Sequence, residues 1–196
     1  MTAGIRTALK SLMGLIGTMV AMPFVFVANR DRYLEAHDEL FVLGGQALAV
    51  VPGLIGNAAR SAYYKRTLAL FEEGASIHFG SYFSKRGARI HAQVGIGAYC
   101  VIGLVDIGPR TRIASRVSIT SGLHYHGSAM AGIGAVDCVE RVSIGADSWI
   151  GEGAVIGADV GASCIVGMGS VVISPIPDRS AVIGNPARRI PSAANA

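Results

Sequence analysis

The sequence predicts an all-β domain, a parallel β-helix of hexapeptide repeats, preceded by an apolar α-helical extension. Two observations support this fold class. Apolar residues, often followed by glycine, recur about every six residues through the C-terminal two thirds of the chain. The N-terminal third instead holds two long apolar stretches without that period. A period of six matches neither the 3.6-residue period of a helix nor the two-residue period of a strand.

Three short strands in each triangular coil explain the repeat. Each branched residue points into the prism, and the next residue occupies a tight corner where glycine fits. Most steps are six residues long, with slips of seven, five and four after Phe83, Ile102 and Ile156. The sequence therefore predicts inward-facing side chains at Ile77, Phe83, Ile90, Ile96, Ile102, Ile107, Ile113, Ile119, Ile144, Ile150, Ile156, Val160, Val166 and Val172.

These patterns divide the chain into two regions. Residues 1–70 are expected to form an apolar helical, membrane-associating region, and residues 71–196 the β-helix. The repeat is silent between about residues 120 and 143, where the sequence TSGLHYHGSAMAGIGAVDCVERV interrupts two well-formed halves. An excursion from a rigid scaffold is where functional groups are expected.

Composition narrows the classes of partner. The formal net charge is +4, but Lys and Arg are scattered and no basic run is interleaved with aromatic residues, so we expect no nucleic-acid partner. Anionic lipid or an anionic cofactor accounts better for the positive charge. The three cysteines, Cys100, Cys138 and Cys164, show no CxxC pairing, which argues against a disulfide framework or a zinc knuckle.

The motifs SWIG (148–151), GMGSVV (167–172) and GNPAR (184–188) resemble those of the hexapeptide acyltransferases. This resemblance covers roughly the last 120 residues. It implies a left-handed coil, acetyl-CoA as acyl donor, a homotrimer and no metal. The stretch from Val50 to Leu68, leading into HFGSYFSKRGARI, resembles a narrower branch linked to cell-surface polysaccharide assembly. That likeness implies O-acetylation of a sugar or glycan.

The loop supplies the candidate catalytic residues. The spacing of VSITSGLH, which ends at His124, matches the loop histidine of this superfamily, and His126 is the second candidate. Imidazole titrates near neutral pH, so it suits a general base that removes a hydroxyl proton. Asp137, Glu140 and Asp106 are candidates for the carboxylate that orients this histidine, and the sequence does not choose between them.

By matched position, the resemblance also implies a path for coenzyme A between subunits. Trp149 and Gly151 are expected to line the path, followed by Gly167, Met168, Gly169 and Ser170. Arg188 matches a basic position near the nucleotide phosphates, with Arg189 or Arg179 as supplements. The chain departs from the family at Ile173-Ser174, where many relatives carry Thr-Lys, so one phosphate contact must come from elsewhere.

Three other functions stay open. The acceptor could be a small molecule such as serine or an antibiotic, or the prism could be a non-catalytic scaffold. A metal hydratase of the γ-carbonic-anhydrase type needs two close histidines five residues apart, whereas His124 and His126 are two apart. His78 and His91 are therefore expected at corners or on the surface.

The apolar stretches Ser11–Asn29 and Leu40–Ala59 are each about long enough to cross a bilayer, and Pro23 and Pro52 interrupt them. Kinked or re-entrant helices fit this pattern, and a pair of helices packed on the β domain is the alternative. A signal peptide is disfavoured because Phe26-Val27-Ala28 lacks a small-x-small site. Basic outer flanks predict a hairpin with both ends cytoplasmic, at the inner membrane or in the cytoplasm.

Overall fold

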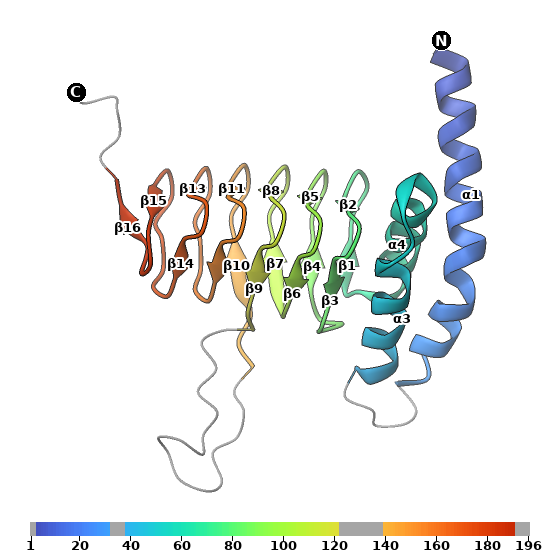
Figure 1. The fold of residues 1–196 in the computed structure, drawn as a ribbon, viewed down its shortest axis with the longest axis horizontal. Helices are drawn as coiled ribbons and strands as arrows, with labels where there is room; N and C mark the ends of the chain where they lie inside the picture. The colour runs from blue at the N-terminus through green and yellow to red at the C-terminus, as the bar shows by residue number, and fades with distance from the viewer. Residues whose placement is uncertain (1–2, 32–37, 122–138, 191–196) are drawn as a thin grey trace, which may run out of the picture.

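The computed structural model describes residues 3–31, 38–121 and 139–190, and within them the chain forms a parallel β-solenoid capped at one end by helices (Figure 1). The solenoid has about five turns. Strands from successive coils stack in parallel, and the helical layer lies against the first coil, at the far end from β16 (Arg188–Arg189). The predicted fold class, a parallel β-helix with an N-terminal apolar helical extension, is confirmed.

Three sheets form the sides of the prism, and we call them faces A, B and C. Face A stacks β1 (Leu70–Phe71), β4 (Arg89–Ile90), β7 (Val105–Ile107) and β10 (Val142–Ile144). Face B stacks β2 (Ser76–Ile77), β5 (Gly95–Ile96), β8 (Arg112–Ile113), β11 (Trp149–Ile150), β13 (Ile165–Val166) and β15 (Ala181–Ile183), with β16 antiparallel at the end. Face C stacks β3 (Tyr82–Phe83), β6 (Val101–Ile102), β9 (Ser118–Ile119), β12 (Val155–Ile156) and β14 (Val171–Val172).

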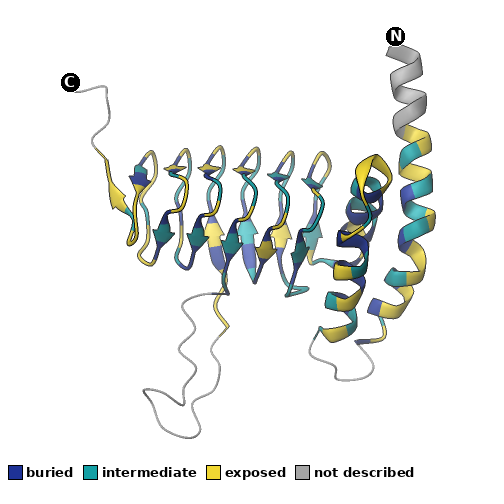
Figure 2. Ribbon diagram, in the orientation of Figure 1, coloured by how far each residue is buried: buried dark blue, intermediate teal, exposed yellow. Residues whose placement is uncertain are grey.

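The register places the predicted branched residues one above another inside the prism. On face A, Ile90 pairs with Ile107, and Ile107 with Ile144, and all three are fully or almost fully buried. Isolated bridges from Ile144 through Val160 to Ile176 continue this column after the four-residue slip. Figure 2 shows the resulting buried interior along the length of the solenoid. Every inward position that the repeat predicts is buried.

The corners between faces A and B need a left-handed backbone in every coil. Gln93, Arg110, Asp147, Ser163 and Arg179 have φ between 55° and 62° there. This conformation strains residues that carry a Cβ, so the stacked ladder must hold it in place. Backbone bonds between coils do so: for example, the Asp147 amide donates to the Pro109 carbonyl at 3.0 Å. The corners are thus set by stacking as well as by glycine.

The helical layer consists of α1 (Ala3–Ala28), α3 (Glu39–Ala49) and α4 (Gly53–Thr67). The second apolar stretch of the sequence is therefore not one helix, because a turn at Val50–Pro52 separates α3 from α4. With 11 residues, α3 is about 16 Å long, roughly half of what a bilayer requires. In the described part of the chain only α1 holds a window, Ser11–Ala28, long and apolar enough to cross a membrane by length and composition.

Arg60 of α4 joins the helical layer to the solenoid. Its side chain is fully buried, and its guanidinium donates to the carbonyls of Leu48 (2.9 Å), Ala49 (3.3 Å) and Val51 (2.9 Å). Nε donates to the carbonyl of Ile77 in the first coil at 3.2 Å, and Nη2 donates to Asn57 Oδ1. Burial lowers the pKa of Arg60. The carbonyl dipoles at the C-terminus of α3 are the groups that stabilise its charge.

A second arginine, Arg86, ties the other end of the helical layer to the solenoid. Its Nη2 donates to the Ala28 carbonyl at the end of α1 (2.7 Å) and lies 3.3 Å from Asp31 Oδ2. Asp31 in turn accepts from the backbone amides of Leu40 and Phe41 at the start of α3, at 3.1 and 2.8 Å. The layer is therefore fixed on the first coil at both ends.

We expect Arg60→Met to lower the free energy of unfolding by roughly 3 kcal/mol or more, because it leaves several buried carbonyls without donors. The measurement is urea unfolding followed by the helical circular dichroism signal. Arg66→Met is the matched control, since exposed Arg66 on the same helix makes one bond to the Ala62 carbonyl and its loss should change stability by less than about 1 kcal/mol. Equal effects of the two substitutions would contradict this assignment.

Candidate active site

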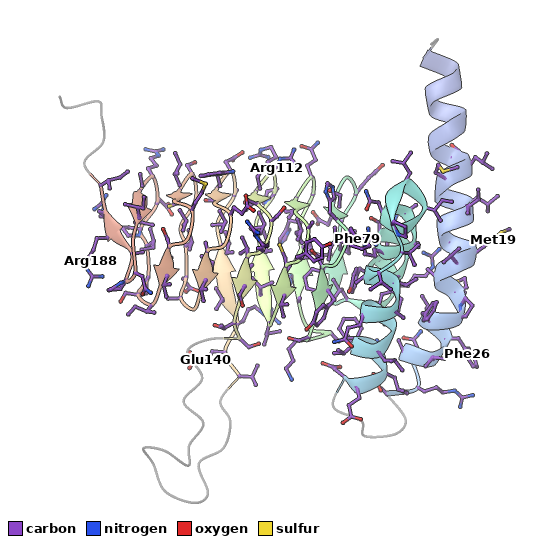
Figure 3. The ribbon with its side chains drawn as sticks, viewed as in Figure 1. Met19, Phe26, Phe79, Arg112, Glu140 and Arg188 are labelled. Atoms are coloured by element: carbon purple, nitrogen blue, oxygen red, sulfur yellow. The ribbon has the colours of Figure 1, made fainter. Side chains whose placement is uncertain are left out.

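The predicted catalytic loop leaves the solenoid at the corner between faces C and A. His124 and His126 lie outside the described residues, as does Asp137. Ser121 and Glu140, which we call the loop roots, are held together because the Glu140 amide donates to the Ser121 carbonyl at 3.1 Å. Ser121 Oγ also accepts from the Leu104 amide of the preceding coil at 2.9 Å. The loop thus starts and ends at one fixed point, halfway along the prism (Figure 3).

Asp106, one of the carboxylates proposed to orient the histidine, is already engaged on face A. Its Oδ1 lies 3.0 Å from Nε2 of His91, and its Oδ2 lies 3.5 Å from Nε of Arg89. His91 is half-buried, and its other nitrogen lies 3.6 Å from Glu72. As predicted, His91 and the exposed His78 are corner residues. The described residues contain no group of three or more His, Cys, Asp or Glu side chains that could hold a metal.

The residues predicted to line the coenzyme path gather at the C-terminal end of face B and its corner with face C. Trp149 points outward from β11, and the next strand carries Ile165 directly beside it. Met168 follows at the adjoining corner, and Ile183 lies on the following strand. These four apolar side chains are between 42% and 69% exposed, and we call them the C-terminal patch. A patch of this kind suits the apolar parts of a ligand.

Arg188 extends this patch with a positive charge. It lies on β16, where it pairs with Ile183 of the patch, and its side chain is exposed (Figure 3). Arg189 is its exposed neighbour on the same strand, and Arg179 lies at the corner between faces A and B. A guanidinium beside apolar side chains is the combination that a phosphate-bearing, partly apolar ligand requires.

Two predicted glycines serve the stacking of coils. A Cβ on Gly151 would lie 2.6 Å from the Met168 backbone nitrogen of the next coil. A Cβ on Gly167 would lie 3.0 Å from the side chain of Ile183. Gly169 differs, because it has φ of +66° and open space around its Cβ position. The expected approach of backbone to ligand therefore fits Gly169, while the lack of a side chain at Gly151 is already explained by packing.

The Ser170 side chain lies inside the prism. Its residue is fully buried, and its Oγ has no hydrogen-bond partner among the described residues. At other corners a serine joins successive coils: Ser81 Oγ donates to Gly97 and accepts from Cys100, and Ser148 Oγ accepts from Cys164. Because β14 is the edge strand of face C, no further strand of this face supplies such a partner to Ser170. Its hydroxyl therefore faces the core, away from the C-terminal patch.

Within one chain, the loop and the patch occupy different parts of the prism. The loop roots lie at the corner between faces C and A, and the patch lies on face B, the side opposite that corner. A site that combines a loop histidine with a ligand on the patch is more easily built by two neighbouring copies, each supplying one part. This geometry bears directly on the oligomeric state.

Comparison with solved structures places the fold. A maltose O-acetyltransferase from Clostridium difficile 630 superposes with a TM-score of 0.59 and 18% identity, over 83% of this chain and 89% of that one. A galactoside acetyltransferase in complex with coenzyme A gives 0.53 and 26%, over 68% and 70%. A hexapeptide-repeat acetyltransferase from Vibrio cholerae O1 biovar eltor, complexed with acetyl coenzyme A, gives 0.52 and 20%, over 69% and 76%.

The chain has the hexapeptide-repeat acyltransferase fold. The predicted resemblance is thereby confirmed, and the galactoside acetyltransferase is a relative with this fold whose structure contains coenzyme A. No protein-family model matches the chain, and no curated protein matches its sequence.

Sequence reasoning missed two arrangements in this acyltransferase fold. The first is the His91–Asp106 contact, whose signal was the spacing: Arg89 pairs with Asp106 on the next coil, which brings His91 beside the same carboxylate. The second is Ile165 and Ile183 in the C-terminal patch, which the repeat marks as outward or terminal positions next to Trp149 and Arg188. Neither required information beyond the register of the coils.

We expect coenzyme A to change the fluorescence of Trp149, the single tryptophan of the chain, because the patch is the predicted contact surface for the ligand. Trp149→Ala and Arg188→Ala should each weaken binding about tenfold in calorimetry, and the effect of Arg188→Ala should shrink at high salt. Arg89→Ala is the control, since this exposed arginine lies on face A, away from the patch. Unchanged emission together with unchanged affinity in both variants would remove the patch from the coenzyme site.

Proposed function

We propose that the protein is an acyl-CoA-dependent O-acetyltransferase that transfers an acetyl group from acetyl-CoA to a hydroxyl of a sugar, in the biosynthesis of cell-surface polysaccharide. The observation that carries the proposal is the C-terminal patch with Arg188 beside it, on a fold shared with acetyltransferases complexed with coenzyme A. The patch would contact the apolar chain of the coenzyme, and Arg188 would bind its phosphates.

In this reaction the loop and the region of the C-terminal patch have different roles. A loop histidine, His124 or otherwise His126, takes the proton of the acceptor hydroxyl as its oxygen attacks the thioester carbonyl. The carbon–sulfur bond then breaks, and the imidazolium returns the proton to the departing thiolate. A backbone amide of this region would stabilise the negative charge that develops on the carbonyl oxygen, although the amides of Gly167, Gly169 and Ser170 themselves already donate to backbone carbonyls. No covalent acyl-enzyme is needed, since the sugar attacks the donor directly.

The descriptions of two solved structures with this fold support a sugar as the class of acceptor. Two acetyltransferases with this fold are described as a maltose O-acetyltransferase and a galactoside acetyltransferase. The placement in polysaccharide assembly rests on the resemblance of residues 50–68 and 78–90. The acceptor should therefore be sought among glycans and lipid-linked sugars first.

A homotrimer is supported by the contrast between the three faces. The outward positions of face C are Tyr82, Val101, Ser118, Val155 and Val171, with no charge among them. Face A instead carries Arg89, Asp106 and Asp159 outward. Face A thus carries charges of both signs, face C none, and face B only arginines, which suits a closed ring in which face A stays in solvent. In such a ring the loop of one copy can approach the patch of the next.

The experiment that tests the function is acetyl transfer from acetyl-CoA to a panel of sugars, with serine included and the product located by mass spectrometry. We expect His124→Ala to lower turnover by roughly 100-fold, because a general base typically contributes that much, while coenzyme A binding persists. His126→Ala should have the smaller effect. The reverse order would move the base to His126, and normal turnover in both variants would refute the mechanism.

Sedimentation should give the mass of a trimer, and Val101→Glu on face C should dissociate it, since the new charge would be buried between copies. Ser143→Lys on face A is the matched control, because it also adds one charge. The lysine would lie beside Asp106 and Asp159 and remain in solvent. A fully active monomer would contradict the shared site, and loss of the trimer in the control would contradict the choice of faces.

A further inference from the structure

The helix α1 presents mostly small residues to the other helices and large ones to the outside, although Val25 is also buried. Gly17, Ala21 and Ala28 are buried. A Cβ on Gly17 would lie 2.6 Å from the carbonyl carbon of Ala58 on α4, so the two helices approach at backbone distance. A surface helix in water shows the opposite arrangement, with its large apolar residues toward the core. Small residues between helices and large ones outward are typical of helices in contact with lipid.

The outward face of α1 is a continuous apolar stripe. It consists of Leu12, Leu15, Met19, Met22 and Phe26, which we call the α1 stripe, and each is between 46% and 65% exposed. These spacings of three and four residues put all five side chains on one side of the helix. Met19 and Phe26 point away from α3, α4 and the solenoid (Figure 3). From Ser11 to Ala28 the helix carries no charged residue.

The stripe does not have the features of a coiled coil between two copies. Its spacing resembles a heptad pattern, but it spans only two heptads, fewer than a stable coiled coil requires. Charged side chains normally flank such a seam and select the partner. The flanking positions here are uncharged: Ile16, Thr18, Pro23 and Val25.

The charges around the stripe complement an anionic surface. Arg30 follows the C-terminal end of α1 and lies over the ring of Phe26, 5.1 Å from its centroid. Lys65 and Arg66 are also exposed, on the last turn of α4, but they lie on another side of α1 from the stripe and share a cleft with Glu72 and Glu73. Among the described side chains, Arg30 is therefore the basic one beside the stripe itself. The acidic Asp31 and Asp38 are instead held by Arg86, at 3.3 and 3.5 Å. Basic side chains beside an apolar face favour membranes that contain anionic lipid.

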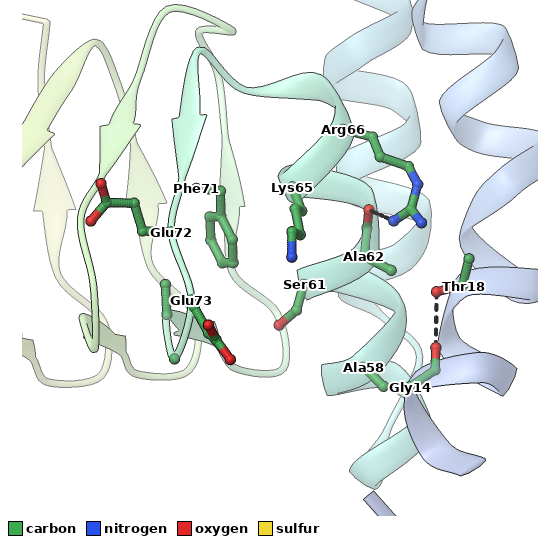
Figure 4. Close-up of a pocket in the computed structure, with 12 residues that line it drawn as sticks. Gly14, Thr18, Ala58, Ser61, Ala62, Lys65, Arg66, Phe71, Glu72 and Glu73 are labelled. Atoms are coloured by element: carbon green, nitrogen blue, oxygen red, sulfur yellow. Dashed lines mark hydrogen bonds between the residues drawn. The ribbon is translucent and has the colours of Figure 1, made fainter. Parts of the chain in front are cut away.

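The surroundings of α1 decide between lying on a membrane and crossing it. A cleft of about 690 Å³ opens where α1, α4 and the first coil meet, and Gly14 and Thr18 of α1 line it together with Lys65, Arg66, Glu72 and Glu73 (Figure 4). Gly14 and Thr18 belong to the apolar window Ser11–Ala28. If α1 crossed a bilayer in this arrangement, four ionisable side chains would lie beside it at membrane depth, which is strongly unfavourable.

We propose that the α1 stripe binds the surface of an anionic lipid bilayer, with α1 lying in the plane of the interface. The stripe enters the boundary between headgroups and acyl chains, and the opposite side of α1 keeps its contacts with α4. This replaces the hairpin of two membrane segments expected from the sequence, because α3 is too short and both α3 and α4 pack on the first coil. The proposal is independent of the acetyl transfer proposed above.

Vesicle flotation of the full-length protein tests the stripe. The protein should float with vesicles of phosphatidylethanolamine and phosphatidylglycerol, and it should float less with phosphatidylcholine alone. Met19→Glu combined with Phe26→Glu should lower the partition coefficient at least about tenfold, since two buried apolar side chains become charged. Ile173→Glu combined with Ile190→Glu is the matched control, because both isoleucines are comparably exposed at the other end of the chain. Point variants are preferable to removing residues 1–60, which would take away Arg60 and uncover the first coil.

The depth of α1 separates the two membrane arrangements. A fluorophore is attached to a cysteine introduced at position 12, 19 or 26, in a background with Cys138 replaced by serine, and is quenched by lipids brominated at known depths; the remaining Cys100 and Cys164 are buried and shielded from the label. Equal, shallow depths at the three positions are expected for a helix in the plane. A maximum depth at position 19 would show a crossing helix and overturn the proposal.

Three further results would also overturn it. One is flotation of the Met19→Glu, Phe26→Glu variant equal to that of the control variant. Another is equal binding of the wild type to neutral vesicles, which would remove the role of the basic side chains. The third is a lower mass of the stripe variant in sedimentation without vesicles, which would identify the stripe as a contact between copies. Unchanged helical circular dichroism in both variants verifies that they are folded.

Discussion

The position of the helical layer depends on the buried guanidinium of Arg60. A buried cation without its acceptors is strongly unfavourable, so the end of α3, the turn into α4 and the first coil must all stay where their carbonyls meet it. This fixes α4 on the solenoid, and the close approach at Gly17 fixes α1 on α4. The outward direction of the α1 stripe is therefore a consequence of packing elsewhere. Carbonyl dipoles also explain why the site tolerates an arginine to which none of the described carboxylates is bonded.

The stacking of coils imposes the second constraint, because each side chain position is repeated on the coil above. Successive strands lie about 4.8 Å apart, so outward residues form ladders whose chemistry belongs to a whole face. Acidic and basic side chains both lie on face A, and the exposed apolar side chains of the C-terminal patch gather on face B and its corner with face C. The longest interruption of the repeat lies between β9 and β10, and the bond between Glu140 and Ser121 closes it so that stacking continues through β10. A rigid scaffold thus tolerates a long insertion at the point where chemistry is expected.

The interior could be predicted from the sequence because a period of six has one structural explanation, and Ile77 through Val172 are buried as the repeat requires. The environments of residues at the ends and corners of the coils could not be predicted in this way. The sequence places Ser170 in the GMGSVV motif, but it does not show that the hydroxyl points into the last coil. Gly151 was predicted for its approach to a ligand, whereas the neighbouring coil already occupies the space. Arg60 directly follows the second apolar stretch, where the sequence predicted a basic flank, and only the tertiary structure shows that it is buried and bound to carbonyls of α3 and the first coil. His124 and His126 stay predictions, since they lie outside the described residues.

The two proposed surfaces lie at opposite ends of the solenoid, and this separation has a functional consequence. The α1 stripe faces outward beyond the first coil, and the C-terminal patch occupies the coils from β11 to β15, roughly 15 to 25 Å further along the axis at the usual strand spacing. With α1 in the plane of a bilayer, the patch is held away from the lipid, where a soluble acyl donor can reach it without crossing the headgroups. The loop roots lie between the two ends, on the third and fourth coils. An acceptor carried on a lipid would then approach from the side of the helices and the donor from the side of β16, so that the two substrates meet at the loop without competing for one entrance.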